Sequence, residues 1–176
     1  TVSSVSASAS TVSLTLASTI FVGDTVTVSY SDPSGSDDAN AVQDSAGNDA
    51  ATISAQAVTN SSSQKRSQSI SFASLAPRTI GTGTFTLSAS TLSGLAESTT
   101  TTATGLSVTF TSATTARCTV ASTTVTLVSA GTCTINANQS GTSNYNAASQ
   151  VQQSFTVSET LTITTPASGL GATYNS

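Results

Sequence analysis

Apolar residues alternate with serine and threonine in short runs along most of this chain of 176 residues. The alternation is regular over residues 12–16, 25–30 and 106–110. A period of two is typical of a β-strand that buries one face. We find no sustained apolar period of 3.6 residues, so the sequence predicts an all-β protein of antiparallel sandwiches without helices of normal length.

The stretch from residue 118 to residue 135 contains both cysteines and three short β-patterned runs, 118–120, 125–127 and 133–135. Cys118 shares a strand face with Val120, and Cys133 shares one with Ile135, so both sulfurs point toward the expected core. We interpret the pair as a disulfide that cross-links a β-sandwich. The alternative is a redox or metal pair, but the chain has no histidine, no second cysteine pair and no Cys-x-x-Cys motif.

Further strands are expected over residues 51–58, 70–72, 85–87 and 151–157, and a last one is expected to begin at residues 161–163. Two polar segments are predicted as loops: a Ser/Thr-rich connection over 92–105 and a loop over 136–146. The polar segment 59–68 is expected to be a flexible boundary. We therefore divide the chain into a partial domain (1–59), a complete domain (60–158) and the start of a further repeat or linking strand (159–176).

Most of the acidic residues lie in or near one segment rich in turns, residues 31–50. Its aspartates are Asp32, Asp37, Asp38, Asp44 and Asp49. Several of these carboxylates in one loop could hold Ca²⁺, which prefers six to eight oxygen ligands, although the spacing is not that of an EF-hand. The alternative is turn chemistry, in which Asp44 caps backbone amides and Gly47 takes a positive φ. Calcium is the one cofactor that the sequence suggests.

Charge and residue types exclude several classes of function. Only 7% of the residues are charged, the net charge is −4, and four residues are basic. A protein that tracks phosphates needs clustered Lys and Arg, so nucleic-acid binding is not expected. No run reaches the ~18 apolar residues of a membrane helix.

Without histidine no Ser-His-Asp or Cys-His catalysis is available, and the acids do not suggest a pair across a cleft, so we do not expect an enzyme. Outward rows of threonine suit ice or glycan binding, but threonine is also simply a good strand residue.

The second domain resembles the bacterial immunoglobulin-like repeats of giant surface and adhesin-type proteins. The resemblance covers residues 69–157 and is carried by ISFASL, FTLSAS, GLSVTFTS, CTV, VTLVSAGTCTINANQSGTSNYNAA and QSFTV. In that family the positions of Cys118 and Cys133 correspond to a structural disulfide. The segment AESTTTTAT (96–104) departs from the pattern and is expected to enlarge one loop.

Residues 12–59 resemble part of a surface repeat named after cyanobacterial cell-surface swimming proteins, through VSLTLAST, GDTVTVSYSDPSG and AVQDSAGNDAA. The first strands expected of such a repeat are missing, and residues 161–176 resemble the opening of another immunoglobulin-like repeat. Together these resemblances imply tandem immunoglobulin-like sandwiches in an excerpt of a long array, in which each domain contacts mainly its neighbours.

The function implied is structural. We expect a segment of a long secreted or surface-displayed bacterial protein that acts as an adhesin stalk, a spacer or a component of an extracellular filament. Its expected partners are neighbouring repeats and further copies of the chain, joined by strand addition. A calcium-dependent or glycan-binding adhesion module around residues 32–49 is the alternative. No membrane insertion is expected in this segment.

Overall fold

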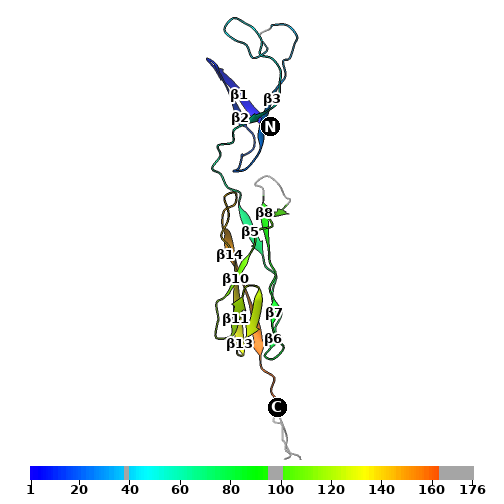
Figure 1. Ribbon diagram of the computed structural model, residues 1–176, viewed down its shortest axis with the longest axis vertical. Helices are drawn as coiled ribbons and strands as arrows, with labels where there is room; N and C mark the ends of the chain where they lie inside the picture. Colours follow the sequence, from blue (N-terminus) through cyan, green and yellow to red (C-terminus); the bar gives the residue numbers. More distant parts are fainter. Residues whose placement is uncertain (38–39, 95–100, 163–176) are drawn as a thin grey trace, which may run out of the picture. The chain divides into compact units, whose positions relative to one another are not determined.

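The computed structural model describes residues 1–37, 40–94 and 101–162, and among them it contains strands but no helix (Figure 1). This confirms the all-β prediction. The chain divides into two compact units. The first unit comprises Thr1–Arg66 and Gly141–Asn146, and the second comprises Ser67–Ser140 and Ala147–Ser176. The first unit therefore includes a short loop that lies, in sequence, between two strands of the second.

The described part of the first unit contains four strands, in two separate antiparallel sheets of two strands each. They are β1 (Val2–Ser8), β2 (Thr11–Leu16), β3 (Val26–Tyr30) and β4 (Ile53–Val58). β1 pairs with β2 and β3 pairs with β4. The predicted strands at 12–16, 25–30 and 51–58 are all present, because β-branched and aromatic residues at alternate positions favour extended backbone.

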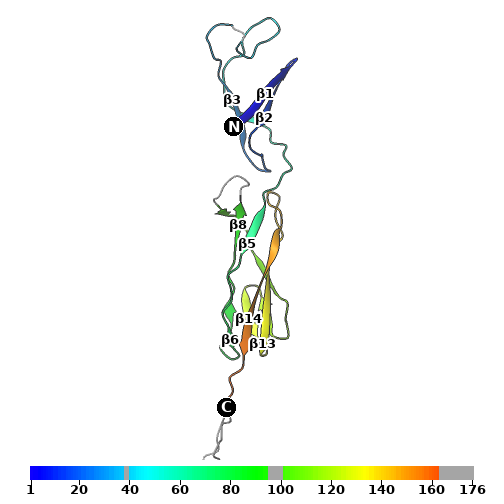
Figure 2. The ribbon, with the colours of Figure 1, turned by 180° about the vertical axis from the view of Figure 1, so that it is seen from behind.

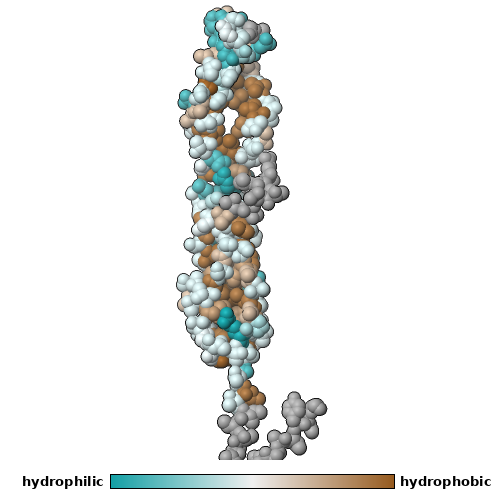
Figure 3. Space-filling view, turned by 90° about the vertical axis from the view of Figure 1, so that its right-hand side faces the viewer, coloured by the Kyte–Doolittle hydropathy of each residue, from teal (hydrophilic) through white to brown (hydrophobic). Residues whose placement is uncertain are grey.

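The alternation in the first unit does not produce a buried face, contrary to our expectation for residues 12–16. In β2, Val12, Leu14 and Leu16 each expose 40–42% of their surface. In β1, Val5 exposes 61%. Among the residues that the structure describes, the buried set contains no member of the first unit. Apolar surface is visible on it in the space-filling view (Figure 3). A two-stranded sheet by itself buries little side-chain surface, so these side chains stay partly in water.

In its described residues the second unit contains ten strands in three sheets. One sheet has the order β10-β13-β14-β6, the second β11-β12-β7 and the third β5-β8-β9. Figures 1 and 2 show this unit from opposite sides. The strands are β5 (Gln68–Ser71), β6 (Arg78–Thr79), β7 (Phe85–Thr86), β8 (Ser90–Gly94), β9 (Thr101–Ala103), β10 (Thr109–Ser112), β11 (Cys118–Ala121), β12 (Thr124–Leu127), β13 (Gly131–Gln139) and β14 (Ala148–Ser158).

One hydrophobic core lies between these sheets. It is made of Ile70, Phe72, Leu87, Phe110, Cys118, Val125, Cys133, Ile135, Ala137, Phe155 and Val157. Two aromatic pairs contribute to it: Phe72 lies 5.3 Å from Phe110 and Phe85 lies 5.6 Å from Phe155, measured between ring centroids. These tilted and edge-on geometries are the ones that aromatic rings prefer. Fold class and core are thus established for the second unit, whereas the tandem immunoglobulin-like arrangement stays a prediction.

Two loop predictions in the second unit are wrong. Residues 92–105 were expected to be a connection, but they contain the end of β8 and all of β9, which pair with each other. The inward residues of β8 are Thr91 and Ser93, which are buried although polar. Thr91 satisfies its hydroxyl by donating to the carbonyl of Leu106 at 3.1 Å. A strand whose inner face is polar carries no apolar period, so the pattern missed it.

The predicted loop 136–146 is also wrong in its first part, since β13 continues to Gln139. Asn136 and Asn138 point outward, while Ala137 lies fully buried between them. β10 pairs with β13 on one side and β14 pairs with it on the other. Hydrogen bonds on both sides outweigh the poor strand propensity of asparagine.

Smaller differences concern strand ends. The alternating run 106–110 enters its strand only at Thr109. Leu161 and Thr162 form no strand, and Ile163–Ser176 lie outside the described residues, as do residues 96–100 of the expected loop insertion.

The boundary segment 59–66 is held by hydrogen bonds instead of being free. The side-chain amide of Asn60 donates to the carbonyls of Phe21 and Asp24, both at 2.9 Å. The Ser62 hydroxyl donates to the carbonyl of Ile20 at 2.7 Å. This segment therefore belongs structurally to the first unit, whose first stretch ends at Arg66.

Candidate functional site

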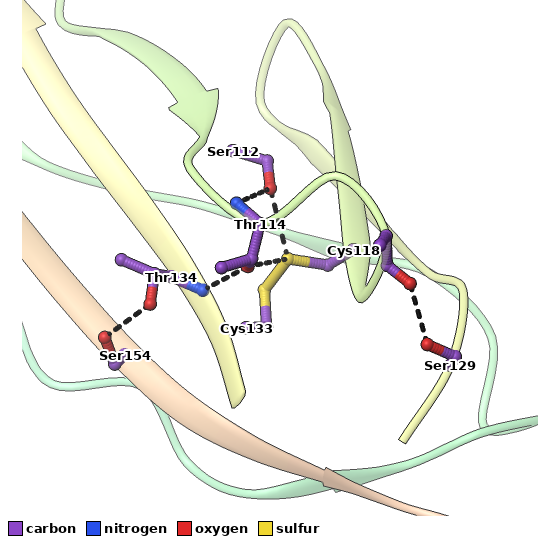
Figure 4. The surroundings of a disulfide bond; sticks show 8 residues. Ser112, Thr114, Cys118, Ser129, Cys133, Thr134 and Ser154 are labelled. Carbon is purple, nitrogen blue, oxygen red and sulfur yellow. Dashed lines mark hydrogen bonds between the residues drawn. A yellow bond between two sulfur atoms is a disulfide. The ribbon is translucent and has the colours of Figure 1, made fainter. Parts of the chain in front are cut away.

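The disulfide predicted from the sequence is present, and it joins β11 to β13 (Figure 4). The two Cα atoms are 5.7 Å apart, which is within the range that a disulfide spans without moving the backbone. Both cysteines are fully buried. β11 and β13 belong to different sheets, so this covalent bond ties two layers of the core together.

Uncharged hydroxyl groups lie close to the sulfur atoms. The Ser112 hydroxyl lies 3.4 Å from Cys118 Sγ. The Thr114 hydroxyl accepts a hydrogen bond from the Thr134 amide at 2.9 Å, and the Thr134 hydroxyl lies 2.8 Å from that of Ser154 (Figure 4). A reactive cysteine needs exposure and a nearby positive charge that stabilises the thiolate. Because both cysteines are buried among neutral groups, the environment supports a structural bond rather than a redox pair.

The connection from β12 to β13 is braced by Arg117. Its guanidinium donates to Ser129 Oγ at 2.9 Å and to the carbonyl of Ala130 at 2.7 Å. Gly131 has φ +133°, a backbone angle that favours glycine. A Cβ there would approach Arg117 Nε to 2.9 Å. The arginine and the glycine together set the path by which the chain enters β13 and carries Cys133 into the core.

The tight turn at Asp44 is the second candidate site. Asp44 Oδ1 accepts hydrogen bonds from the amides of Ala46 at 2.8 Å and Asn48 at 3.0 Å, and Oδ2 accepts one from Asn48 Nδ2 at 2.8 Å. The hydrogen bond from the Asn48 side chain is the main cause that lowers the pKa of Asp44, followed by the backbone bonds. Gly47 has φ +90°. The predicted capping by Asp44 and positive φ of Gly47 are both confirmed.

The other aspartates of the predicted calcium site also accept hydrogen bonds. Asp32 Oδ1 accepts one from the amide of Ser34, and Asp37 Oδ1 accepts one from the amide of Asp49. The carboxylate of Asp49 accepts a hydrogen bond from the side-chain amide of Gln43 at 2.8 Å. Asp38 lies outside the described residues. Within the described ranges, no group of three or more potential ligand side chains is placed to hold a metal ion. Calcium binding therefore stays a prediction.

Sequence reasoning missed an ion pair between Asp24 and Arg66. The guanidinium of Arg66 also lies over the ring of Phe21, 4.9 Å from its centroid, and Asp24 Oδ2 accepts the Phe21 amide at 2.9 Å. The hydrogen bond from Arg66 is the main cause that lowers the pKa of Asp24. Arg66 is one of few charged residues in the chain, so the sequence suggested that it has a partner. The sequence could not identify Asp24 as that partner, because the two residues are 42 positions apart.

A shallow groove of about 860 Å³ opens on the first unit. It is lined on one side by residues of β1 and β2, including Val5, Ala7 and Val12, and on the other by the loop that carries Asp44 and Asp49. The lining mixes exposed apolar side chains with loop polar groups whose hydrogen bonds are described above.

The chain matches no known family model, no curated protein and no solved structure. No helix able to span a membrane is found in the described part of the chain. The site geometry must therefore support any functional conclusion by itself.

Proposed function

We propose that this chain is a structural segment of a long secreted or surface-displayed bacterial protein, where it serves as a spacer or stalk. The observation that carries the proposal is the buried bond between Cys118 and Cys133, which joins two sheets around one core. Disulfides persist in oxidising compartments, so such a bond suits a protein that works outside the cytoplasm.

The topology of the second unit suits a load-bearing role. The last residues of β14 pair with β6 in parallel, Val157 with Arg78 and Ser158 with Thr79. The amide of Ile80 adds a hydrogen bond to the carbonyl of Ser158 at 2.9 Å. A pull on β14 toward the C-terminus loads these bonds in shear, so that they must break together. Residues between the two cysteines cannot extend under load while the disulfide is intact.

Single-molecule stretching tests this role. We expect the second unit to unfold at a defined force. Its length gain should be smaller by roughly 50 Å when the disulfide is intact, because the cysteines are separated by 15 positions in sequence, each of which would extend by about 3.5 Å. A second unit that extends without a force peak would rule out the spacer role.

Assembly into filaments by strand addition is a second candidate, supported by the first unit. Its two small sheets have strand edges outside their own pairing and apolar side chains that are exposed, and both features invite a strand from another copy. Electron microscopy of unreduced protein separates the two candidates. Filaments with a repeat of one or two units favour strand addition, whereas separate particles at all concentrations contradict it and leave the spacer.

A further inference from the structure

The outer face of the sheet β10-β13-β14-β6 carries side-chain amides as well as hydroxyl groups. The residues that alternate with the buried ones on β10, β13 and β14 are half-buried or exposed. They are Thr109, Thr111, Thr132, Thr134, Asn136, Asn138, Gln150, Gln152, Ser154, Thr156 and Ser158. None of these residues is charged, aliphatic or aromatic. We call this set the amide–hydroxyl face.

Two asparagines lie in the middle of the face, where strand propensity does not favour them. Asn136 and Asn138 occupy β13, which has a partner strand on each side. Asparagine is depleted in strands, and threonine, which fills equivalent outward positions nearby, is favoured there. Residues that break a local rule in this way are often found at functional sites. The hydrogen-bonding groups of these amides are therefore the feature to explain.

The amides are arranged as cross-strand pairs. Gln152 Nε2 donates to Asn136 Oδ1 at 2.8 Å, and Gln150 Nε2 donates to Asn138 Oδ1 at 2.7 Å. The hydroxyls of Thr134 and Ser154 continue the row at 2.8 Å (Figure 4). Each primary amide has two donor hydrogens and an acceptor oxygen. In either orientation of the amides, one hydrogen bond per pair uses one donor hydrogen and one acceptor oxygen. The remaining amide hydrogens and lone pairs are available to a ligand, and the bond within each pair holds the two side chains in place.

We propose that the amide–hydroxyl face binds a neutral polysaccharide chain. Without Lys or Arg the face has no attraction for polyanions, and without Asp or Glu it has none for cations. Without apolar side chains it gives little to an apolar peptide. Fixed neutral groups that both donate and accept hydrogen bonds match a polymer of hydroxyl groups. The outward row on β13 runs from Thr132 to Asn138 and spans roughly 20 Å at about 3.3 Å per residue.

Affinity at one face is expected to be weak, because the face has no aromatic ring on which a sugar could stack. Repetition of the face on a tethered or polymeric scaffold raises the effective concentration and compensates for weak single contacts. The inference goes beyond the proposed spacer role: it adds binding along the length of the protein to mechanical support.

The test uses the full chain of 176 residues with its disulfide intact. Affinity electrophoresis or sedimentation is run against a fixed panel of neutral polysaccharides, namely cellulose, amylose, mannan and β-1,3-glucan, with alginate as the anionic control. The central variant replaces all four amides: Asn136→Thr, Asn138→Thr, Gln150→Thr and Gln152→Thr. The matched control carries Thr119→Ala and Thr126→Ala, at cross-strand partners exposed on β11 and β12.

We expect retention by at least one neutral polymer and not by alginate. The four-amide variant should bind at least about tenfold more weakly, since several hydrogen bonds are lost, and the control should bind like the parent. The variant should still fold, because the better strand propensity of threonine offsets the loss of the two cross-strand amide hydrogen bonds. If it fails to fold, the β14 pair alone, Gln150→Thr with Gln152→Thr, is measured instead.

Three outcomes overturn the proposal: no retention on any panel member, equal binding by the amide variant, or equal binding to alginate. Sedimentation equilibrium addresses another occupant of the face, since a dimer that only the amide variant disrupts would assign the face to a second copy and overturn the polysaccharide. None of these outcomes depends on the stretching experiment, so the spacer role and this binding role stand or fall separately.

Discussion

The two units of this protein are built from the same kinds of strand residues and reach different degrees of burial. In the second unit, alternating residues of β13 and β14 such as Ile135 and Val157 are 0–2% exposed. In the first unit, Val12 and Leu14 alternate equally well and are 40–42% exposed. The difference shows that alternating apolar and polar residues favour a strand, whereas burial of the apolar face requires a second sheet packed against it. The second unit supplies that layer from its own sheets and cross-links it covalently.

The largest expected effect comes from removing similar apolar volume from each unit. Ile135→Ala should destabilise the second unit by about 2–5 kcal/mol, because Ile135 is fully buried and leaves a cavity. Leu14→Ala should cost the first unit less, about 1 kcal/mol, because its side chain is already 40% exposed. Denaturant titration followed by hydrogen exchange with mass spectrometry resolves the two units. Similar losses in both would mean that Leu14 is covered in solution.

Removal of the disulfide is the next largest change. Cys118→Ala with Cys133→Ala should destabilise the second unit by roughly 3 kcal/mol, as expected for a separation of 15 residues. Exchange protection in β1 to β4 should stay unchanged. Chemical reduction of the parent protein is the matched comparison, since it opens the same bond without replacing either side chain. A drop in the first unit as well would contradict independent stability of the two units.

Two glycine positions sharpen the comparison at the level of the backbone. Gly131→Ala should cost the second unit about 1–3 kcal/mol, because φ +133° is strained for alanine and the new Cβ would displace Arg117. Gly47→Ala, at φ +90° with open space around it, should cost the first unit less. Thermal melting monitored by circular dichroism measures both. In the double variant Arg117→Ala with Gly131→Ala, the clash with the arginine is removed, so the remaining loss of stability measures the backbone strain alone.

The smallest expected effect is a dependence on pH that is confined to the first unit. The pKa values of Asp24 and Asp44 are lowered in the folded state by their hydrogen bonds. Their stabilisation is therefore complete above the ordinary aspartate pKa of about 3.9 and is lost as the pH falls through the lowered values. The second unit has one carboxylate side chain among its described residues, Glu159, which follows β14.

An NMR titration from neutral to acidic pH checks this prediction. Amide signals around Phe21, Ala46 and Asn48 should shift below about pH 4, while those of the core strands stay in place. Asp24→Asn and Asp44→Asn are the matched controls, since each keeps an acceptor oxygen without the charge. Titration that affects β13 and β14 first would contradict the assignment to the first unit.

Much of this architecture is readable from the sequence alone because it depends on local chemistry. The all-β class follows from Val, Thr and Ile at a period of two, and the turn at Asp44 follows from the capping carboxylate and Gly47. The disulfide was also predictable, since Cys118 and Cys133 lie on the inward faces of their runs. The strand and turn inferences need only residues that are adjacent in the chain, and the disulfide inference needs only the inward position of each cysteine within its own run.

The rest was decided by contacts between residues that are distant in the chain. β8 is a strand because β5 and β9 pair with it on its two sides, and the buried Thr91 hydroxyl finds a partner at Leu106, which no apolar pattern indicates. β13 continues through Asn136 and Asn138 because strands lie on both of its sides. Arg66 meets Asp24 only in the folded chain. Local propensity is worth a fraction of a kilocalorie per residue, so pairing and burial override it wherever the tertiary structure supplies a partner.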